Sequence, residues 1–164
     1  MIFVTSVAFP GCRRKRLPGA PKNVILLVLD TTRADHVAPI GKRARTPNLR
    51  RMAREGTTFT RAYSHIPITG PSHSSMFTSL YPREHGVLNN GQNLSGSHST
   101  LAEIMRDAGY HTVAFMSLMT LDRRYGFNQG FAEYHDRFGH DWWKRADAIN
   151  GQILPWLRNN RDRP

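Results

Sequence analysis

The strongest constraint on the fold is a short run that is apolar after its first residue. Residues 23–29 read NVILLVL and are followed directly by Asp30. An apolar, β-branched-rich run without alternation is typical of a strand that is buried on both faces of a parallel sheet. Asp30 then lies at the carboxyl edge of that sheet, where open α/β folds bind their ligands. The run therefore predicts a buried strand that ends in an acidic group.

Helix signals follow this run. Thr46 and Pro47 supply an N-cap and a first-turn proline for a helix that extends to Glu55, and Gly56 closes it. The next segment, 57–63, reads TTFTRAY and predicts a second strand.

The second half of the chain repeats the alternation. Thr100 and Glu103 form a capping box for a helix over 101–108, and 110–116 reads as a strand. An amphipathic helix starts near Asp141 and is expected to kink or end near Pro155. Strands that alternate with helices predict an α/β architecture, with a mainly parallel sheet flanked by helices.

The net charge of +11 is confined to two segments. Residues 1–22 hold five basic residues and no acid, and residues 42–61 hold seven basic residues against Glu55, so +5 and +6 give the whole +11. A binder of nucleic acid or anionic membranes is an alternative that rests on these segments alone. Because the aromatic residues do not interleave with the basic ones, as a single-strand groove requires, we expect no nucleic-acid partner.

We interpret residues 1–22 as a basic leader or a disordered tail. The apolar run MIFVTSVAFPGC ends in Cys12, as a lipoprotein signal does, but it is short and no positive charge precedes it. A clipped signal implies a periplasmic or extracytoplasmic protein, and otherwise we expect a cytoplasmic one. The single cysteine excludes a disulfide framework or a Cys-based zinc site within the chain. No run reaches the ~18 apolar residues of a transmembrane helix.

Two segments carry groups suited to ester chemistry. In Thr69-Gly70-Pro71, a hydroxyl precedes a proline at a helix start, where backbone N–H groups and the helix dipole favour an oxyanion. Thr69 is thus a candidate nucleophile for phosphate or sulfate, and the alternative is that Thr69 or Ser72 only caps the helix. A hydroxyl needs a base or a metal to activate it, and Asp30 is the best candidate for a hard-metal ligand. Asp30 could instead cap the next loop.

Basic side chains accompany both segments. Arg33 can pair with Asp30 or Asp35, or reach substrate oxygens through its bidentate fork. Histidines are also concentrated here, although a loop histidine can equally be solvated; they are His36, His65, His73 and His85.

Five sequence blocks in order resemble the N-terminal half of the sulfatase family. They are NVILLVLDTTRADH, TPNLRRMAREGTTFTRAYS, TGPSHSSMFTSLYPREHGV, TLAEIMRDAGYHTVAF and YGFNQGFAEY. This family lies within the alkaline-phosphatase-like superfamily of metal-dependent hydrolases of phosphate and sulfate esters. The resemblance implies an α/β sandwich and a nucleophile at Thr69. It also implies a divalent metal (Ca, Mg, Mn or Zn) held partly by Asp30 and Thr69, and a small-molecule, glycan or lipid ester as substrate.

The chain departs from the family pattern at several functional positions. Sulfatases proper oxidise the cysteine or serine of a C/S-x-P-S-R motif to formylglycine, whereas this frame begins with Thr69, so we expect no formylglycine. His73 stands at the arginine of that motif, and Thr31 stands where many members have a second metal-binding aspartate. Ser117 and Met119 stand where a lysine and a histidine would contact sulfate.

These departures keep several functions open. Threonine nucleophiles elsewhere in the superfamily serve phosphodiesterases and phosphoethanolamine-type transferases, so phosphoryl chemistry is expected at least as much as sulfate hydrolysis. In the family, further metal ligands follow the region that resembles 23–164. We therefore expect this region to be the N-terminal part of a catalytic domain that is incomplete at its C-terminus. The enzyme is expected to be either truncated or split, and in a split enzyme a second chain supplies the missing half. The alternative is a catalytically inactive fragment or a binding module.

Overall fold

The computed structural model describes residues 3–7, 22–41 and 43–160. The chain divides into two compact units that are not placed relative to one another. The first comprises Met1–Val28 and His65–Pro164, and the second comprises Leu29–Ser64.

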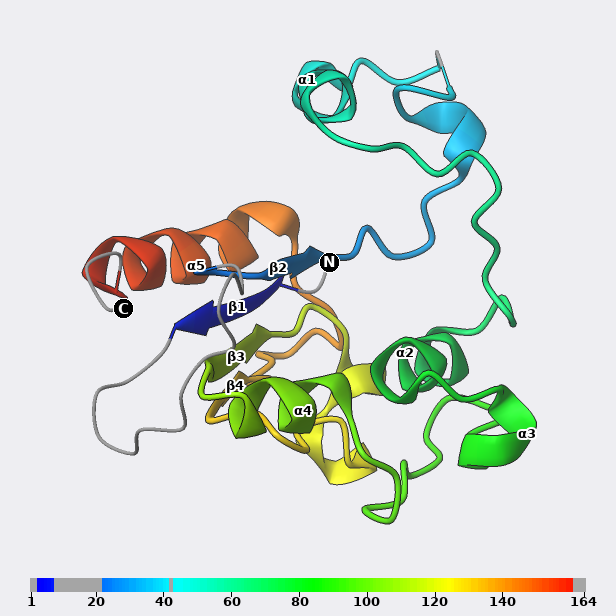
Figure 1. Ribbon diagram of the computed structural model, residues 1–164, viewed down its shortest axis with the longest axis vertical. Coiled ribbons are helices and arrows are strands. Elements are labelled where there is room, and N and C mark those ends of the chain that lie inside the picture. Colours follow the sequence, from blue (N-terminus) through cyan, green and yellow to red (C-terminus); the bar gives the residue numbers. More distant parts are fainter. Residues whose placement is uncertain (1–2, 8–21, 42, 161–164) are drawn as a thin grey trace. The chain divides into compact units, whose positions relative to one another are not determined.

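A four-stranded sheet forms the centre of the first unit (Figure 1). Its order is β2-β1-β3-β4, with β1 at Phe3–Val7, β2 at Ile25–Leu27, β3 at His111–Phe115 and β4 at Glu133–His135. β1 is antiparallel to both β2 and β3, whereas β3 and β4 are parallel. β2, β3 and β4 therefore point the same way, and the expected mainly parallel sheet is a mixed one because β1 runs against the others.

β1 comes from the segment that was interpreted as a leader. Its sequence, FVTSV, is rich in β-branched and aromatic residues, which favour strands. The other residues of that segment, apart from Lys22, lie outside the described residues.

The expectation that 23–29 is buried on both faces is wrong. Only Ile25–Leu27 form the strand, and Ile25 is 53% exposed. The reason is position: β2 is at the edge of the sheet and pairs only with β1 among the described strands. Leu26 and Val28 still pack against the core.

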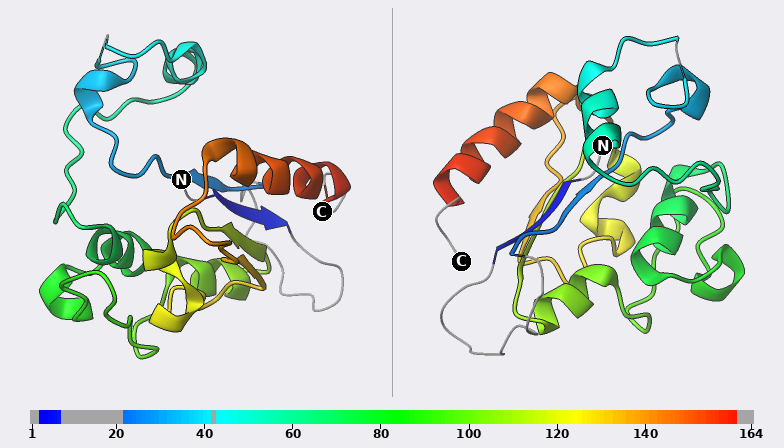
Figure 2. Two further views of the ribbon diagram at one scale, coloured as in Figure 1. Left: turned by 180° about the vertical axis from the view of Figure 1, so that it is seen from behind. Right: turned by 45° about the horizontal axis from the view of Figure 1, so that its top comes forward.

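Helices cover both faces of the sheet (Figures 1 and 2). On one face, α2 (Thr69–Thr78) inserts Phe77 among Ala114, Met116, Leu121 and Phe127. On the other face, α5 (Ala146–Asn160) packs Ile149 and Ile153 against Val113 and Phe115 of β3. Side chains alternate along a strand, which explains how β3 serves both cores. This layering agrees with the expected α/β class.

Two shorter helices complete the first unit. α3 spans Pro82–His85, and α4 spans Leu101–Asp107. The predicted capping box of α4 is confirmed: the Glu103 N–H donates to Thr100 Oγ1 (3.2 Å), and the Thr100 N–H donates to Glu103 Oε2 (2.8 Å). α5 begins later than predicted, at Ala146, and continues through Pro155 to Asn160.

The second unit contains α1 (Pro47–Glu55), which matches the predicted helix, and a short 3-10 helix at Ala34–His36. Thr46 does not cap α1 with its side chain; its Oγ1 instead accepts from the Ala38 N–H (2.9 Å). The strand predicted at 57–63 is not formed. Phe59 and Tyr63 are about four-fifths exposed (78% and 83%), so the apolar pattern has no core to face.

None of the helices among the described residues combines the length and the apolarity needed to cross a membrane.

Candidate functional site

Thr69 is the first residue of α2, a ten-residue helix preceded by Ile68 in an extended conformation. The Ser72 N–H donates to the Ile68 carbonyl oxygen (3.0 Å), which closes the first turn. Pro71 has no N–H, and the Gly70 N–H donates to Oδ1 of Asn90 (2.8 Å). Thr69 therefore belongs to the helix rather than capping it with its side chain, and its half-buried side chain lies at the positive end of the helix dipole.

Asn90 is a residue that the sequence analysis missed. It lies 20 residues after Gly70, in the turn Asn89-Asn90-Gly91, where Gly91 has a φ of +83°. The Asn-Gly pair is a turn signal that the sequence contains, but the turn signal does not show which helix the asparagine contacts. Asn90 supplies a side-chain acceptor to a helix whose N-cap, Ile68, cannot do so.

His73 lies one turn into α2 and is 2% exposed. Its Nδ1 is 2.7 Å from the carbonyl oxygen of Thr69. A carbonyl only accepts, so Nδ1 carries the proton and donates it. The structure thus brings His73 and Thr69 together through the Thr69 backbone, and the ring packs edge-on toward Phe77 at 6.3 Å between centroids.

A second buried histidine supports α2 from α3. The Val87 N–H donates to Nδ1 of His85 (3.1 Å), so Nδ1 is unprotonated, and Nε2–H donates to Oγ of Ser75 (3.0 Å). Burial lowers the pKa of His85, and the nearby His98 lowers it further. The bond from the Val87 N–H needs an unprotonated Nδ1, so α3 is attached to α2 by an uncharged imidazole.

Asp30 and Arg33 lie in the second unit. Asp30 Oδ2 accepts from the Thr31 hydroxyl (3.1 Å), and Thr31 has a φ of +55°. Of the two acids considered for Arg33, the structure selects Asp35: Nε and Nη2 donate to Oδ1 and Oδ2, both at 3.0 Å. The Asp35 hydrogen bonds raise the pKa of Arg33, and the same bonds lower the pKa of Asp35.

Two of the four predicted site residues, Asp30 and Arg33, thus lie in the second unit, and Thr69 and His73 lie in the first; the two units are not placed relative to one another. Among residues 3–7, 22–41 and 43–160, no group of three or more His, Cys, Asp or Glu side chains gathers to hold a metal ion. A hard divalent cation takes about six oxygen ligands.

Ser117 and Met119, which replace the lysine and histidine of the family pattern, follow β3. The Lys144 N–H donates to the Ser117 carbonyl oxygen (2.8 Å), and the Met119 N–H donates to the Trp142 carbonyl oxygen (2.8 Å). Leu118 and Trp143 form an antiparallel bridge between these bonds. The backbone of Lys144 is thereby held beside Ser117.

Comparisons with known proteins identify related sequences. The family model described as Sulfatase matches residues 22–153. An N-acetylglucosamine-6-O-sulfatase of Bacteroides thetaiotaomicron is 28% identical over 84% of this chain and 27% of its own length. An arylsulfatase of Clostridium perfringens is 34% identical over 85% of this chain and 31% of its own length. The multifunctional alkaline phosphatase superfamily protein PehA of Trinickia caryophylli is 35% identical over 54% of this chain and 18% of its own length. No solved structure gives a significant match.

These sequence matches place the chain in the alkaline-phosphatase-like superfamily of ester hydrolases. Within it, the chain belongs to the sulfatase family, as its five sequence blocks predict. The chain spans less than a third of the length of the relatives described above.

Proposed function

We propose that this chain forms the N-terminal part of a metal-dependent hydrolase of sulfate or phosphate esters, with Thr69 as the nucleophile. The observation that carries the proposal is the position of Thr69 at the start of α2, within a chain that matches the sulfatase family. A helix N-terminus stabilises negative charge, so it suits a hydroxyl that attacks an anionic ester.

In the proposed step, Thr69 Oγ attacks the phosphorus or sulfur atom, a bond forms from Oγ to that atom, and the ester oxygen leaves. The Thr69 proton passes to a base, and the leaving oxygen is protonated. Water then attacks the phosphorus or sulfur atom, the bond to Thr69 Oγ breaks, and the Thr69 hydroxyl regains a proton as the sulfate or phosphate is released. His73 is 2% exposed and holds the Thr69 carbonyl through Nδ1, which supports a role in positioning the nucleophile. His73 is the candidate for proton transfer at Thr69.

Arg33 is the candidate for stabilising substrate oxyanions. Its fork binds the carboxylate of Asp35 in the same bidentate manner that it would bind a sulfate or phosphate. The side chains of Arg33 and Asp35 are 73% and 46% exposed, and a solvent-exposed ion pair is weak, so the exchange of Asp35 for substrate costs little.

A divalent metal enters the proposal through the family. The oxygen donors that this chain offers are the Asp30 carboxylate and the Thr69 hydroxyl, and the further ligands would come from residues outside these 164. When bound, such an ion supplies Lewis-acid activation of ester and nucleophile.

Both sulfate and phosphate esters fit the proposed nucleophile. Direct attack by a threonine hydroxyl is ordinary for a phosphoryl centre, whereas a sulfo-threonine lacks the hemiacetal route that formylglycine gives for expelling sulfate. The relatives include proteins named as sulfatases and one named as a multifunctional alkaline phosphatase superfamily protein, which supports testing both ester classes. A phosphodiesterase or a phosphoethanolamine-type transferase is the variant of this proposal in which phosphoryl transfer dominates.

A second candidate function is a catalytically inactive fragment or a binding module. It is favoured by the dispersal of acids and histidines among the described residues, which gather in no group of three. Calorimetry on the 164-residue chain tests it: micromolar affinity for a divalent ion would refute it, and the absence of heat at millimolar ion would support it.

The main proposal is tested by Thr69→Ala in the longest reading frame that contains this chain, with Thr78→Ala as a matched loss of a hydroxyl from the other end of α2. We expect Thr69→Ala to abolish turnover of nitrophenyl phosphodiester and nitrophenyl sulfate, and Thr78→Ala to retain it. Undiminished metal-dependent turnover by Thr69→Ala would refute the assignment.

A further inference from the structure

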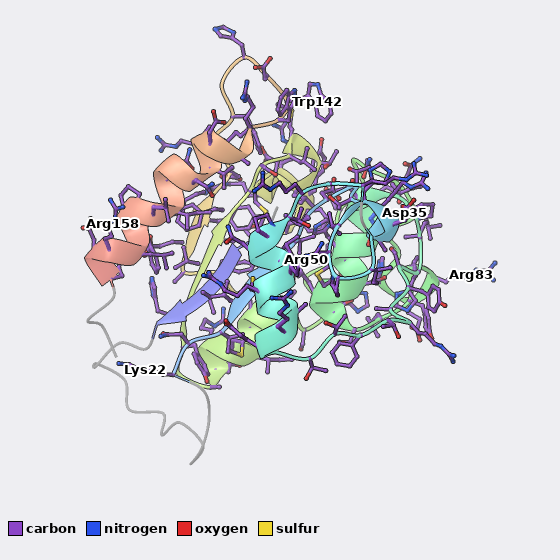
Figure 3. All side chains as sticks on the ribbon, turned by 90° about the horizontal axis from the view of Figure 1, so that it is seen from above. Lys22, Asp35, Arg50, Arg83, Trp142 and Arg158 are labelled. Carbon is purple, nitrogen blue, oxygen red and sulfur yellow. The ribbon has the colours of Figure 1, made fainter. Side chains whose placement is uncertain are left out.

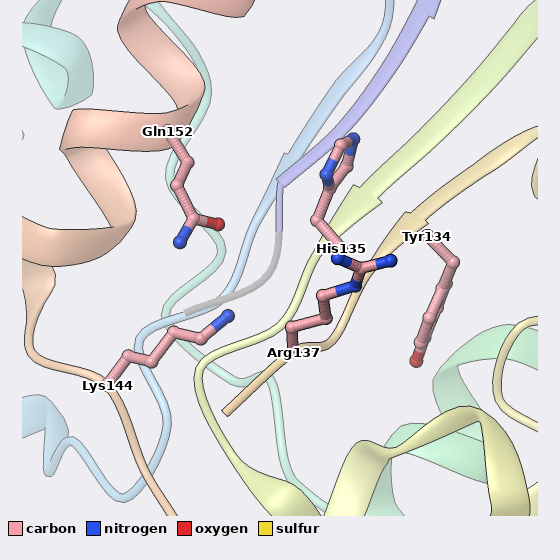
Figure 4. Close-up of a pocket in the computed structure, with 5 residues that line it drawn as sticks. All are labelled: Tyr134, His135, Arg137, Lys144 and Gln152. Atoms are coloured by element: carbon pink, nitrogen blue, oxygen red, sulfur yellow. The ribbon is translucent and has the colours of Figure 1, made fainter. Parts of the chain in front are cut away.

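A pocket of about 210 Å³ opens beside the sheet in the first unit (Figure 4). It is lined by Tyr134, His135, Arg137, Lys144 and Gln152. His135 lies on the same face of β4 as Glu133, which accepts from the indole N–H of Trp156 in α5 (2.9 Å). The pocket therefore lies on the α5 face of the sheet, whereas Phe77 of α2 packs on the opposite face.

The pocket is built on fixed elements. Gln152 is carried by α5, whose neighbouring Ile149 and Ile153 are fully buried. The Lys144 backbone is tied to Ser117 (2.8 Å), and the His135 ring stacks on Phe115 at 4.4 Å between centroids. In Figure 4, Lys144 and Gln152 reach toward the pocket from the side of α5, and His135 and Arg137 line the side of β4.

The cations of the pocket are not neutralised locally. Among the described residues, Arg137 and Lys144 form no ion pair within 4.0 Å. The neighbouring acids bind other side chains: Asp136 binds the Arg123 guanidinium at 2.6 Å, and Glu133 binds His111 at 2.7 Å and the pocket residue His135 at 3.4 Å. Burial lowers the pKa of Lys144, the charge of Asp136 raises it by less, and the ammonium lies over the Phe138 ring at 4.9 Å from its centroid.

We infer that this pocket binds a tetrahedral oxyanion, a sulfate or phosphate group, through the Arg137 guanidinium, the Lys144 ammonium and the Gln152 amide. Arginine offers a planar fork that matches two oxygens of such a group, and lysine offers a point charge to a third. Tyr134 contributes only its ring, because its hydroxyl donates to the Leu121 carbonyl oxygen (2.6 Å). The site involves no covalent step and does not use Thr69, so it goes beyond the proposed function.

The oxyanion has two possible sources, the free inorganic ion or a monoester on a sugar. The loop that precedes α5 is the reason to test a sugar-borne group. In this loop, Trp142 and Trp143 are 61% and 43% exposed and precede Lys144 in the sequence (Figure 3 labels Trp142). Exposed indole rings offer flat apolar faces next to the cations.

The test is a titration of the ¹⁵N-labelled chain with sodium sulfate, sodium phosphate or N-acetylglucosamine 6-sulfate, at constant ionic strength set with sodium chloride. The readout in every variant is the chemical shift of the Gln152 side-chain amide, together with that of the Arg137 Nε–H in the proteins that retain Arg137. We compare wild type with Arg137→Gln and Lys144→Gln, and with Arg158→Gln as a control on the exposed side of α5.

We expect saturable shifts in the wild type. The affinity obtained from them should fall at least tenfold in Arg137→Gln and in Lys144→Gln, and should stay within twofold of wild type in Arg158→Gln and Thr69→Ala. Tighter binding of the sugar sulfate than of free sulfate would identify the ester as the source, and equal binding would identify the free ion. Shifts that do not saturate, or that are equal in all variants with unchanged circular dichroism, would overturn the inference. Since Thr69→Ala should leave this binding intact, failure here is distinguishable from failure of the proposed function.

Discussion

Replacing Asn90 by alanine removes the side-chain oxygen that accepts the Gly70 N–H at the start of α2. Gly70 is buried, so its N–H loses a partner at the turn that presents Thr69. Loss of an N-terminal helix acceptor typically costs ~1 kcal/mol, within a range of ~0.5–2 kcal/mol. Because Asn90 itself is exposed and water can reach its position, we expect about 1 kcal/mol.

Asn90→Asp separates the hydrogen bond from the mere presence of a side chain. The aspartate keeps an acceptor and adds a negative charge near the helix N-terminus, which stabilises by ~0.3–1 kcal/mol. We therefore expect Asn90→Asp to equal or exceed wild type at pH 7, and to lose this gain in high salt.

The assay is urea unfolding followed by circular dichroism, with Asn93→Ala as an exposed control from the same loop. For a chain of this size, about 1 kcal/mol corresponds to roughly 2–4 °C in Tm. An Asn90→Asp protein that is as unstable as Asn90→Ala, or a control that is equally unstable, would refute the conclusion that the Asn90 side chain stabilises the start of α2 by accepting from the Gly70 N–H.

Three further predictions concern the same unit. Gly70→Ala should destabilise rather than stabilise α2, because its Cβ would lie 3.1 Å from Oδ1 of Asn90, and combining it with Asn90→Ala should recover part of the loss in urea unfolding. Burial alone would raise the pKa of Asp136, but the hydrogen bonds from Arg123 outweigh burial and lower that pKa. The Asp136–Arg123 pair therefore stabilises the fold above pH ~4, and its contribution is lost as the pH falls through the folded pKa. Asp136→Asn should cost ~1.5–3 kcal/mol of unfolding free energy at pH 7 and should flatten the acid side of a stability–pH curve. Burial lowers the pKa of His85 below its unfolded value near ~6.5, so the unfolded chain binds the proton first and the free energy of unfolding falls as the pH drops below ~6.5. His85→Gln should remove this contribution to the pH dependence of stability between about pH 7 and 5.

Local patterns predicted the helices well and the strands poorly. The Thr100–Glu103 box and the Pro47 start depend on contacts within one turn, and both helices formed as expected. The burial of 23–29 depends on neighbours on both sides, and β2 has a described neighbour on one side only. Residues 57–63 have strand-forming side chains but no partner strand among the described residues, so propensity alone did not produce a strand.

The candidate site was predictable only where it depends on contacts between residues that are close in the sequence. The sequence placed Thr69 at a helix start and named Asp35 as one partner of Arg33, and both follow from near neighbours in the chain. Asn90 and Lys144 were not found, because their contacts cross 20 and 27 residues to Gly70 and Ser117 and leave no periodic signal. Whether Asp30 meets Thr69 stays a prediction.

The central claim, that Thr69 is the nucleophile of a sulfatase-family ester hydrolase, is tested most directly by trapping the covalent intermediate. The longest reading frame that contains this chain is quenched in acid during turnover of a nitrophenyl phosphodiester or sulfate, and its peptides are mapped by mass spectrometry. The account predicts a phosphoryl or sulfo group on the peptide that contains Thr69, and none on that peptide in Thr69→Ala. Turnover with an adduct on another residue, or with an adduct that persists in Thr69→Ala, would contradict it.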